Sequence, residues 1–406
     1  MNEMRNPRAS GSFMSASSQS AASIRERAKA RGEPEWLVDL RARALARYEE
    51  LEAPQWRRTD LSAHDIAGTA WKAFGRPALA RRSFVKREGV VHLPLAEAAR
   101  EHADIVQPLL GASLRADKWE ALQAALWSDG SLLFVEKDRE VEAPIEAPLA
   151  FTPEGGVARD LLVLRPRAKA NVLTRAVGAS PGALTLAGLE IDVQDGASLT
   201  LSTLQDLHVK STLLSWRRAT LRRDAKLSWV DGQFGGGASV SVNENLLEGA
   251  GSELRFVGAF FGSAGQHMDV TTAALHGGPH TSSQLDMKGA LNDDGYSANY
   301  SIVFIGPDAR NASGHQHQET LVLSEGARAD AIPKLDVENN EVSASHGATV
   351  GQVDPEQLFY LRSRGFSEIA AKRLIVEGFF EPLLEKVPLD GVREEVRQAI
   401  VGRLRG

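Results

Sequence analysis

The sequence has 406 residues, a formal net charge of −6 at pH 7 and 25% charged residues. A negative net charge argues against nucleic acid or an anionic membrane surface as the main partner, and no apolar stretch is long enough to cross a bilayer. Cysteine is absent. Its absence excludes disulfide bonds, thiolate nucleophiles, Cys-ligated zinc and an iron–sulfur cluster held by this chain's own thiolates, and it fits a reducing compartment.

The N-terminal third combines a polar tail with predicted helices. Residues 1–23 are rich in serine and lack the apolar segment of a secretory signal, so we expect them to form a disordered tail. Residues 24–150 are predicted to be mostly helical, with apolar residues at helical spacing over residues 22–48 and 95–126. After Asp129-Gly130 the period changes, and a strand is predicted to follow this turn.

Residues 151–351 differ in kind, because short β-rich runs alternate there with Gly, Asp, Asn and Ser. Three runs echo one another, with Leu199, Leu227 and Leu254 at the same place in each and at spacings of 28 and then 27 residues. Repeated strand–turn units predict coils that stack and bury one another's apolar faces. We therefore expect a mainly β protein, with a parallel β-helix core flanked by N-terminal and C-terminal α-helical regions. A β-sandwich is the alternative.

Residues 352–406 are predicted to be helical again. Asp354-Pro355 opens this region, and Val392, Val396 and Ile400 lie on one face of its last amphipathic segment. Helices this short are marginal in isolation. We expect their apolar faces to pack either on the β-region or on another chain.

Motifs for nucleotide chemistry are missing. The sequence has neither a Gly-Lys dipeptide for a phosphate-binding loop nor a GxGxxG fingerprint, so we expect no nucleotide to be bound by this chain. The segment Gly178-Ala-Ser180-Pro-Gly182 matches the nucleophile elbow of hydrolases. However, Pro181 lacks the backbone N–H that such a site needs to hold an oxyanion. We interpret this segment as a turn.

Two pairs of histidines are candidate ligands. His315 and His317 stand at i and i+2, which on a strand places both imidazoles on one face, as in a metal-binding pair. Only Glu319 stands close enough in sequence to join them, so we prefer the interpretation of two surface histidines. His276 and His280 are interpreted as residues of a turn that satisfy backbone groups, and the roles of both pairs stay open.

His346 is the histidine we single out. Small residues surround it in Ala344-Ser-His-Gly-Ala-Thr-Val-Gly, and they allow another backbone or a cofactor to come close. It lies at the end of the strand-rich region, where the last coil of a stack has an edge that must be covered. A tight turn is the alternative that the residues by themselves favour.

This segment resembles the C-terminal signature of the SufB/SufD family of iron–sulfur cluster assembly scaffold proteins. The resemblance is carried by Ser345-His-Gly-Ala-Thr-Val-Gly-Gln-Val-Asp and by Gln357-Leu-Phe-Tyr-Leu-Arg-Ser-Arg-Gly365. Upstream, Gln55-Trp-Arg-Arg-Thr resembles the family's Trp-Arg-x-Thr element. The SufD branch fits better, because Gly347 stands where the SufB pattern has a glutamate and because the cysteine that SufB supplies is missing. Ala344 stands where many SufD chains carry a cysteine.

The resemblance implies a right-handed parallel β-helix core over residues 151–351 and a heterodimer with a SufB-like subunit at one end of that β-helix. It implies a cytoplasmic protein without nucleic-acid or membrane partners, and a homodimer in the absence of SufB stays open. His346 matches the family's histidine that is implicated in building the nascent cluster, so it is a candidate ligand of iron or of a transient cluster shared with SufB. A SufC-like ATPase is expected to bind residues 352–406, through Leu358, Phe359, Tyr360, Leu361, Arg362, Arg364, Ile369 and Leu374.

We therefore expect a non-catalytic scaffold subunit of a Suf-type iron–sulfur cluster assembly complex rather than an enzyme. Imidazole is a competent iron ligand and replaces Cys at some iron–sulfur centres, whereas a chain without thiols must obtain sulfur ligands from a partner. One alternative is a carbohydrate-active β-helix enzyme that uses carboxylates such as Asp269, Asp286 and Asp293. The other is a purely structural interaction module.

Overall fold

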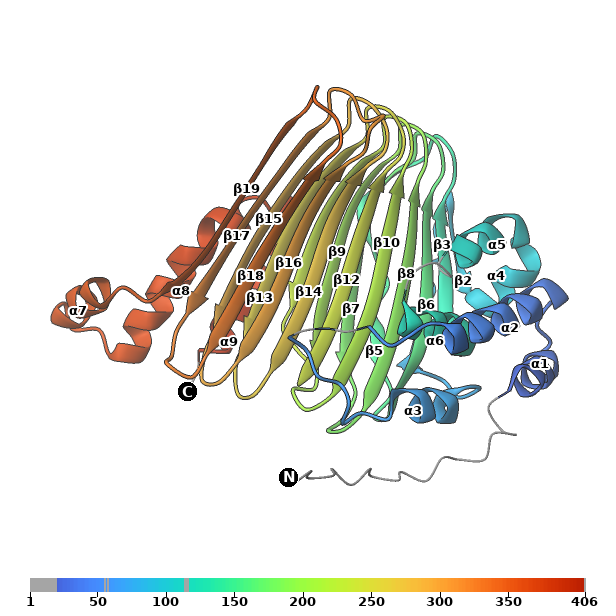
Figure 1. Cartoon of the computed structure of the whole chain (residues 1–406), viewed down its shortest axis with the longest axis horizontal. Helices are drawn as coiled ribbons and strands as arrows, with labels where there is room; N and C mark the ends of the chain where they lie inside the picture. Colours follow the sequence, from blue (N-terminus) through green and yellow to red (C-terminus); the bar gives the residue numbers. More distant parts are fainter. Residues whose placement is uncertain (1–19, 55, 57, 113–116, 405–406) are drawn as a thin grey trace, which may run out of the picture.

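The computed structural model describes residues 20–54, 56, 58–112 and 117–404. Its centre is a solenoid of parallel strands arranged in two facing sheets (Figure 1). From β6 onward, successive strands alternate between the two sheets, and each pairs in parallel with the strand two positions further along the chain. This topology confirms the predicted parallel β-helix and excludes the β-sandwich, whose sheets are antiparallel.

The strands and helices of the described residues have the following bounds. One sheet contains β1 (Leu79–Arg81), β4 (Glu140–Glu146), β5 (Leu149–Phe151), β7 (Lys169–Gly178), β9 (Ser198–Leu207), β11 (Lys226–Gln233), β13 (Glu253–Gly262), β15 (Ser282–Leu291), β17 (Ser313–Val322) and β19 (Ser343–Gln352). The other contains β2 (Val90–Pro94), β3 (Asp129–Val135), β6 (Gly155–Leu164), β8 (Leu184–Val193), β10 (Thr212–Leu221), β12 (Ala238–Leu247), β14 (His267–His276), β16 (Tyr296–Ile305) and β18 (Arg328–Val337). The helices are α1 (Ala21–Ala30), α2 (Glu35–Glu50), α3 (Ile66–Ala73), α4 (Leu95–Glu101), α5 (Ala103–Ala112), α6 (Lys118–Leu126), α7 (Pro355–Ser363), α8 (Glu368–Leu384) and α9 (Asp390–Gly402).

The echo seen in the sequence is the register of the coils. Leu227 on β11 pairs with Leu199 on β9 and with Leu254 on β13, and all three side chains point into the interior of the solenoid, where each is 1% exposed. Before each strand the chain turns through a residue with positive φ, which is Gly196, Asp224 or Gly251 in these three coils. Glycine and aspartate tolerate this conformation, so the turn chemistry and the apolar stack repeat together.

The N-terminal region is divided more finely than the sequence suggested. The run over residues 22–48 forms two helices, because Gly32 adopts φ +69° and Pro34 precedes α2. The run over residues 95–126 contains α4, α5 and α6. Strands β3 and β4 already belong to the solenoid, so its first coil lies before residue 151. Of the predicted tail, residues 1–19 lie outside the described residues, and residues 21–23 form the first turn of α1.

Residues 58–64, which precede α3, run across the outer face of the β18-containing sheet, and we call them the strap (Figure 1). Its first residue, Arg58, forms an ion pair with Asp330 on β18, with 2.7 Å between Nε and Oδ2. Thr59 bonds to Asp269 on β14, and His64 lies 3.3 Å from the Thr212 hydroxyl on β10. The strap thus joins the N-terminal helical region to the last strand of that sheet. Of the segment Gln55-Trp-Arg-Arg-Thr, Gln55 and Arg57 lie outside the described residues.

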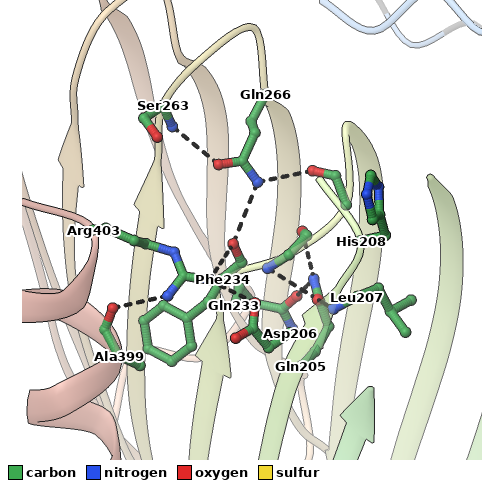
Figure 2. Close-up of polar contacts among 12 residues, drawn as sticks. Gln205, Asp206, Leu207, His208, Gln233, Phe234, Ser263, Gln266, Ala399 and Arg403 are labelled. Carbon is green, nitrogen blue, oxygen red and sulfur yellow. Dashed lines mark hydrogen bonds and ion pairs between the residues drawn. The ribbon is translucent and has the colours of Figure 1, made fainter. Parts of the chain in front are cut away.

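The C-terminal helices pack on the outer face of the other sheet. Val376, Phe380 and Leu383 of α8 and Val392, Val396 and Ile400 of α9 form one buried cluster with apolar residues of β7 to β17. The apolar stripe of α9 therefore covers the β-region of its own chain. At the end of α9, Arg403 donates to the carbonyl oxygens of Phe234 and Ala399 and to the Asp206 carboxylate (Figure 2). The turn after β11, which contains Phe234, is also stabilised by Gln266, whose side-chain amide donates to the Phe234 carbonyl oxygen.

Candidate functional site at the open end of the solenoid

The solenoid ends in two strands with unpaired edges. β18 pairs only with β16 and β19 only with β17, and no strand of the described residues covers them. Unpaired strand edges present backbone N–H and C=O groups that favour pairing with another chain. We call the surface formed by β18 and β19 the open end.

His346 lies in the middle of β19, so the alternative of a tight turn is wrong. It pairs in register with Gln316 on β17, which in turn pairs with Leu285 on β15. Gln316 and Leu285 both point into the solenoid and are 2% and 0% exposed. Because paired residues of parallel strands share a face, His346 is the last member of this inward-facing column, and it is exposed because no further coil lies above it.

The inward-facing residues around His346 offer few other groups that could bind a metal ion. The next inward-facing residues on β19 are Ala344 and Ala348, whose side chains carry no polar atoms. Below it, the Gln316 side chain is already engaged, since its Nε2 donates to the Lys334 carbonyl oxygen and its Oε1 accepts from Ser301. His346 is therefore the inward-facing imidazole of the open end. Within the described ranges, no three His, Asp or Glu side chains are grouped so as to hold a metal ion.

The other predicted histidine pair lies on the outer face of β17. His315 and His317 do share one face, as the i, i+2 spacing predicted. Each has other partners. His315 lies between the hydroxyls of Ser313 and Ser345, and His317 donates from Nε2 to Glu319 Oε1 at 2.7 Å.

His276 ends β14, and His280 lies in the turn between β14 and β15. His276, the last residue of β14, is 0% exposed. The Thr281 hydroxyl donates to the Gly278 carbonyl, so it accepts from His276 Nδ1, and His276 Nε2 accepts from Ser283. Burial lowers the pKa of His276 to about 4, so it is neutral at pH 7. His280 is exposed and has φ +58°, as a turn residue can have.

The residues predicted to bind an ATPase lie on α7, on the turn that follows it and on the first half of α8. This segment projects beyond the last strands of the solenoid (Figure 1). Its large apolar side chains are exposed, with Phe359 at 75%, Tyr360 at 56%, Phe366 at 43%, Ile369 at 60% and Leu374 at 40%. No residue of α7 is buried. We call these five side chains the apolar patch. Of the other predicted residues, Leu358 and Leu361 are half-buried, and Arg362 and Arg364 are exposed.

The carboxylates considered for carbohydrate chemistry do not form a groove. Asp269 lies under Thr59 of the strap on one sheet. Asp286 lies on the other sheet and forms an ion pair with Lys386, and Asp293 is a turn residue with φ +53°. The segment around Ser180 is a turn that leads into a strand, so it lacks the helix of a nucleophile elbow.

Comparison with known proteins identifies the family. The family model described as SUF system FeS cluster assembly, SufBD core domain, matches residues 151–379. The chain belongs to the SufBD family. It is 28% identical over 410 residues to the iron-sulfur cluster assembly protein SufD of Bacillus subtilis, which covers 91% of this chain and 94% of that protein. It is 25% identical over 414 residues to SufB of the same organism, covering 90% and 89%.

A third relative is a SufBD family protein of Staphylococcus haemolyticus, 27% identical over 416 residues that cover 90% of this chain and 89% of that protein. The family assignment connects the solenoid and the helices that follow it with iron–sulfur cluster assembly, because the matched residues run from β5 into α8. None of the helices in the described residues is both long and apolar enough to span a membrane.

Sequence reasoning missed two features near the open end of this SufBD protein. Only Arg58 and Thr59 of the strap belong to the segment that resembles the Trp-Arg-x-Thr element, and that resemblance did not predict the contact of Arg58 with β18. The sequence predicted no structural role for Lys288 on β15, yet its side chain forms hydrogen bonds to Glu319 on β17 and to Phe379 on α8. The register of the coils is a signal that would have placed Lys288 beside Glu319, since the two are paired residues.

Proposed function

We propose that this SufBD protein is a cytoplasmic, non-catalytic scaffold subunit that pairs with a SufB-like subunit through its open end and binds a SufC-like ATPase through the apolar patch. His346 offers an imidazole nitrogen to iron or to a nascent cluster at the interface between the subunits. The iron and the cluster are cargo that the complex assembles. The chain lacks thiols, so the thiolate or sulfide ligands come from the partner subunit.

The position of His346 is the observation that carries this proposal. A histidine on the inward side of an uncovered edge strand faces whatever continues the solenoid. A second subunit that pairs with β18 or β19 would therefore enclose the imidazole between two chains. Two small neighbours, Ala344 and Gly347, leave room beside it for a bound ion.

Two features of the sequence favour the SufD branch of the family. Gly347 follows the histidine where the SufB pattern has glutamate, and no cysteine is present. A chain without cysteine supplies no thiolate ligand, which suits the subunit that complements a cysteine-bearing partner rather than the one that carries the cluster.

The apolar patch supports a second partner. Isolated exposed apolar residues are common, but five large ones on a short projecting segment form a typical protein-binding surface. The segment also carries Arg362 and Arg364, which are exposed and suit an acidic rim on the partner. We propose that the ATPase moves this segment during its nucleotide cycle and thereby changes access to the open end.

The test replaces two histidines by the same residue. His346→Asn removes the imidazole from the open end, and His280→Asn is its control, because His280 is exposed in a turn with positive φ that asparagine tolerates. Each variant is co-purified with its partner subunits, and bound iron and the rate of cluster formation are measured. We expect loss of iron and cluster in His346→Asn and none in His280→Asn, with both complexes intact.

An intact His346→Asn complex that binds iron and builds cluster at the wild-type rate would refute the ligand role. That result would favour the structural interaction module, in which the open end only docks a partner.

A further inference from the structure

Lys288 connects the solenoid with helix α8 of the C-terminal region. Its side chain lies on the outer face of β15, where Nζ donates to Glu319 Oε2 on β17 at 3.1 Å and to the Phe379 carbonyl of α8 at 2.9 Å. The ammonium also lies 4.5 Å from the centre of the Phe379 ring, a distance suited to a cation–π contact. The Lys288 side chain is 12% exposed, so solvent screens these contacts only partly.

From Glu319 the contacts continue to the strand that carries His346. Glu319 Oε1 accepts from His317 Nε2 at 2.7 Å. The His317 ring lies against Gly347, its register partner on β19, where an added Cβ would come within 3.0 Å of His317 Nδ1. Gly347 follows His346 directly in the sequence. The contacts therefore form one continuous series from α8 through Lys288, Glu319 and His317 to β19.

The charge on Glu319 is secured by its partners. Burial would raise the pKa of its carboxyl group, but the hydrogen bonds from Lys288 and His317 outweigh burial and lower the pKa below its usual value. Glu319 is therefore a carboxylate at neutral pH. It links an ammonium to an imidazole N–H by charge-assisted hydrogen bonds, which are stronger than neutral ones.

Lys288 contacts α8 where the helix changes its surroundings. The first half of α8 is exposed at Ile369 and Leu374, and the second half is buried at Phe380 and Leu383, which are 1% and 2% exposed. Pro382 lies inside this helix and cannot donate to the carbonyl four residues earlier, which weakens the helix at the boundary. The Phe379 carbonyl that accepts from Lys288 lies between these two halves, so a displacement of the helix would change this contact.

We propose that Lys288 is a positioning residue that couples the placement of α8 to the conformation of β19 and so to the orientation of His346. When α8 is seated, Lys288 holds Glu319, and Glu319 holds His317 against Gly347. When α8 moves, Lys288 loses its contact with Phe379 and holds Glu319 less firmly. Glu319 then no longer fixes the His317 ring against Gly347 of β19. The inference rests on the proposed function only for what moves α8, since the coupling itself belongs to this chain.

The experiment uses the full-length chain and a matched pair of lysines. Lys288→Met keeps an unbranched side chain and removes the ammonium. Lys386→Met is the control, because Lys386 also joins the C-terminal region to β15, through a 2.9 Å contact with Asp286, but does not touch Glu319. Amide hydrogen exchange is measured for β19 and α8. We expect exchange in β19 to rise about tenfold in Lys288→Met, which corresponds to ~1.4 kcal/mol, and to stay at the wild-type rate in Lys386→Met.

Two further variants separate coupling from simple loss of stability. Lys288→Arg retains a cation that can reach Glu319 and should restore most of the protection of β19. Glu319→Gln breaks the series at its centre, so it should raise exchange in β19 without affecting the cluster of α8 with the solenoid. Equal exchange of β19 in Lys288→Met and Lys386→Met would overturn the inference, as would a Glu319→Gln variant with wild-type exchange.

Failure of this inference is distinguishable from failure of the proposed function. The coupling is measured on the chain alone, whereas the ligand role of His346 is measured as iron and cluster in the complex. If exchange in β19 rises in Lys288→Met as expected while the His346→Asn complex stays fully active, the ligand role of His346 is wrong and the coupling stands. The opposite pair of results would remove only the coupling.

Discussion

Gln316, one coil below His346, joins the two sheets across the interior of the solenoid by a hydrogen bond to Lys334 of the open end. The Gln316 side chain on β17 donates from Nε2 to the Lys334 carbonyl oxygen on β18 at 2.9 Å, and its Oε1 accepts from Ser301 on β16. Gln316 is 2% exposed. A single buried amide therefore satisfies the backbone of one edge strand while it lies directly below the histidine of the other.

This relationship predicts that Gln316→Leu loosens the open end. Leucine has a similar volume but leaves the Lys334 carbonyl and the Ser301 hydroxyl without partners, at a cost of ~1–3 kcal/mol in the free energy of unfolding. Urea unfolding measures that cost, and amide exchange in β18 and β19 locates it. Gln284→Leu on the half-buried outer face of β15 is the control. Equal stability of the two variants would contradict the role of Gln316.

The pH dependence of stability should report the buried imidazole of His276. Its pKa in the folded protein is about 4 because of burial, against ~6.5 in the unfolded chain. The unfolded chain therefore binds the additional proton first, so stability is lost as the pH falls below ~6.5 and the loss levels off below ~4. Linkage gives a contribution of ~2 kcal/mol at pH 5.

His276→Gln should remove that contribution. We expect the variant to lose less stability than the wild type between pH 7 and pH 5, measured by urea unfolding at both values. His92, whose folded pKa is also lowered to about 4 by burial, keeps part of the acid sensitivity in either protein. Parallel pH profiles for the wild type and His276→Gln would show that His276 does not titrate as the structure requires.

Two phenylalanines of the C-terminal region should differ in what their truncation to alanine affects, namely stability for Phe380 and partner binding for Phe359. Phe380 is 1% exposed and packs in the cluster between α8 and the solenoid, so Phe380→Ala should cost ~3–5 kcal/mol in the free energy of unfolding. Phe359 is 75% exposed, and Phe359→Ala should change the free energy of unfolding by less than ~0.5 kcal/mol. Phe359→Ala should instead weaken binding of the ATPase partner, measured by titration calorimetry. Wild-type affinity in Phe359→Ala would remove Phe359 from the proposed interface.

Local sequence signals predicted the repeat in three coils whose inward-facing residues include a leucine at the same place, those of β9, β11 and β13. Leu199, Leu227 and Leu254 occupy the same place in three similar runs of the sequence, and the structure pairs them in neighbouring coils. In β12 the inward-facing residues include Ser241, Asn243 and Asn245, which are buried although they are polar, so an apolar pattern does not mark the inward face of this strand. Polar residues inside a solenoid are stabilised by neighbouring coils, and that information is not local.

The same limit applies to the open end. The small residues around His346 are typical of a turn, and they form a strand because β17 supplies a complete ladder of partners. The contact of Lys288 with Phe379 joins residues 91 positions apart. Neither is visible in the spacing of one segment. The resemblance to the SufB/SufD signature located the histidine, and the register located what supports it.

Thr59 connects the strap to β14 of the solenoid. Thr59 is 6% exposed, its hydroxyl donates to Asp269 Oδ2 at 2.6 Å, and it lies 2.8 Å from His267 Nε2. Burial raises the pKa of Asp269, and the bond from Thr59 opposes that rise. Thr59→Val keeps the shape and removes the hydroxyl, so it should raise the pKa of Asp269 further. It should also cost ~1–3 kcal/mol in the free energy of unfolding at pH 7.

Thr59→Ser keeps the hydroxyl and is the control, with a smaller loss that reflects one methyl group. Carbon-detected NMR titration of Asp269 measures the pKa, and limited proteolysis of residues 58–64 measures release of the strap. If Thr59→Val and Thr59→Ser give the same Asp269 pKa and the same cleavage rate, the hydroxyl does not hold the strap. Because Arg58 beside it pairs with Asp330 on β18, release of the strap should also raise amide exchange at the open end. The N-terminal region would then stabilise the strand edge that the partner subunit must meet.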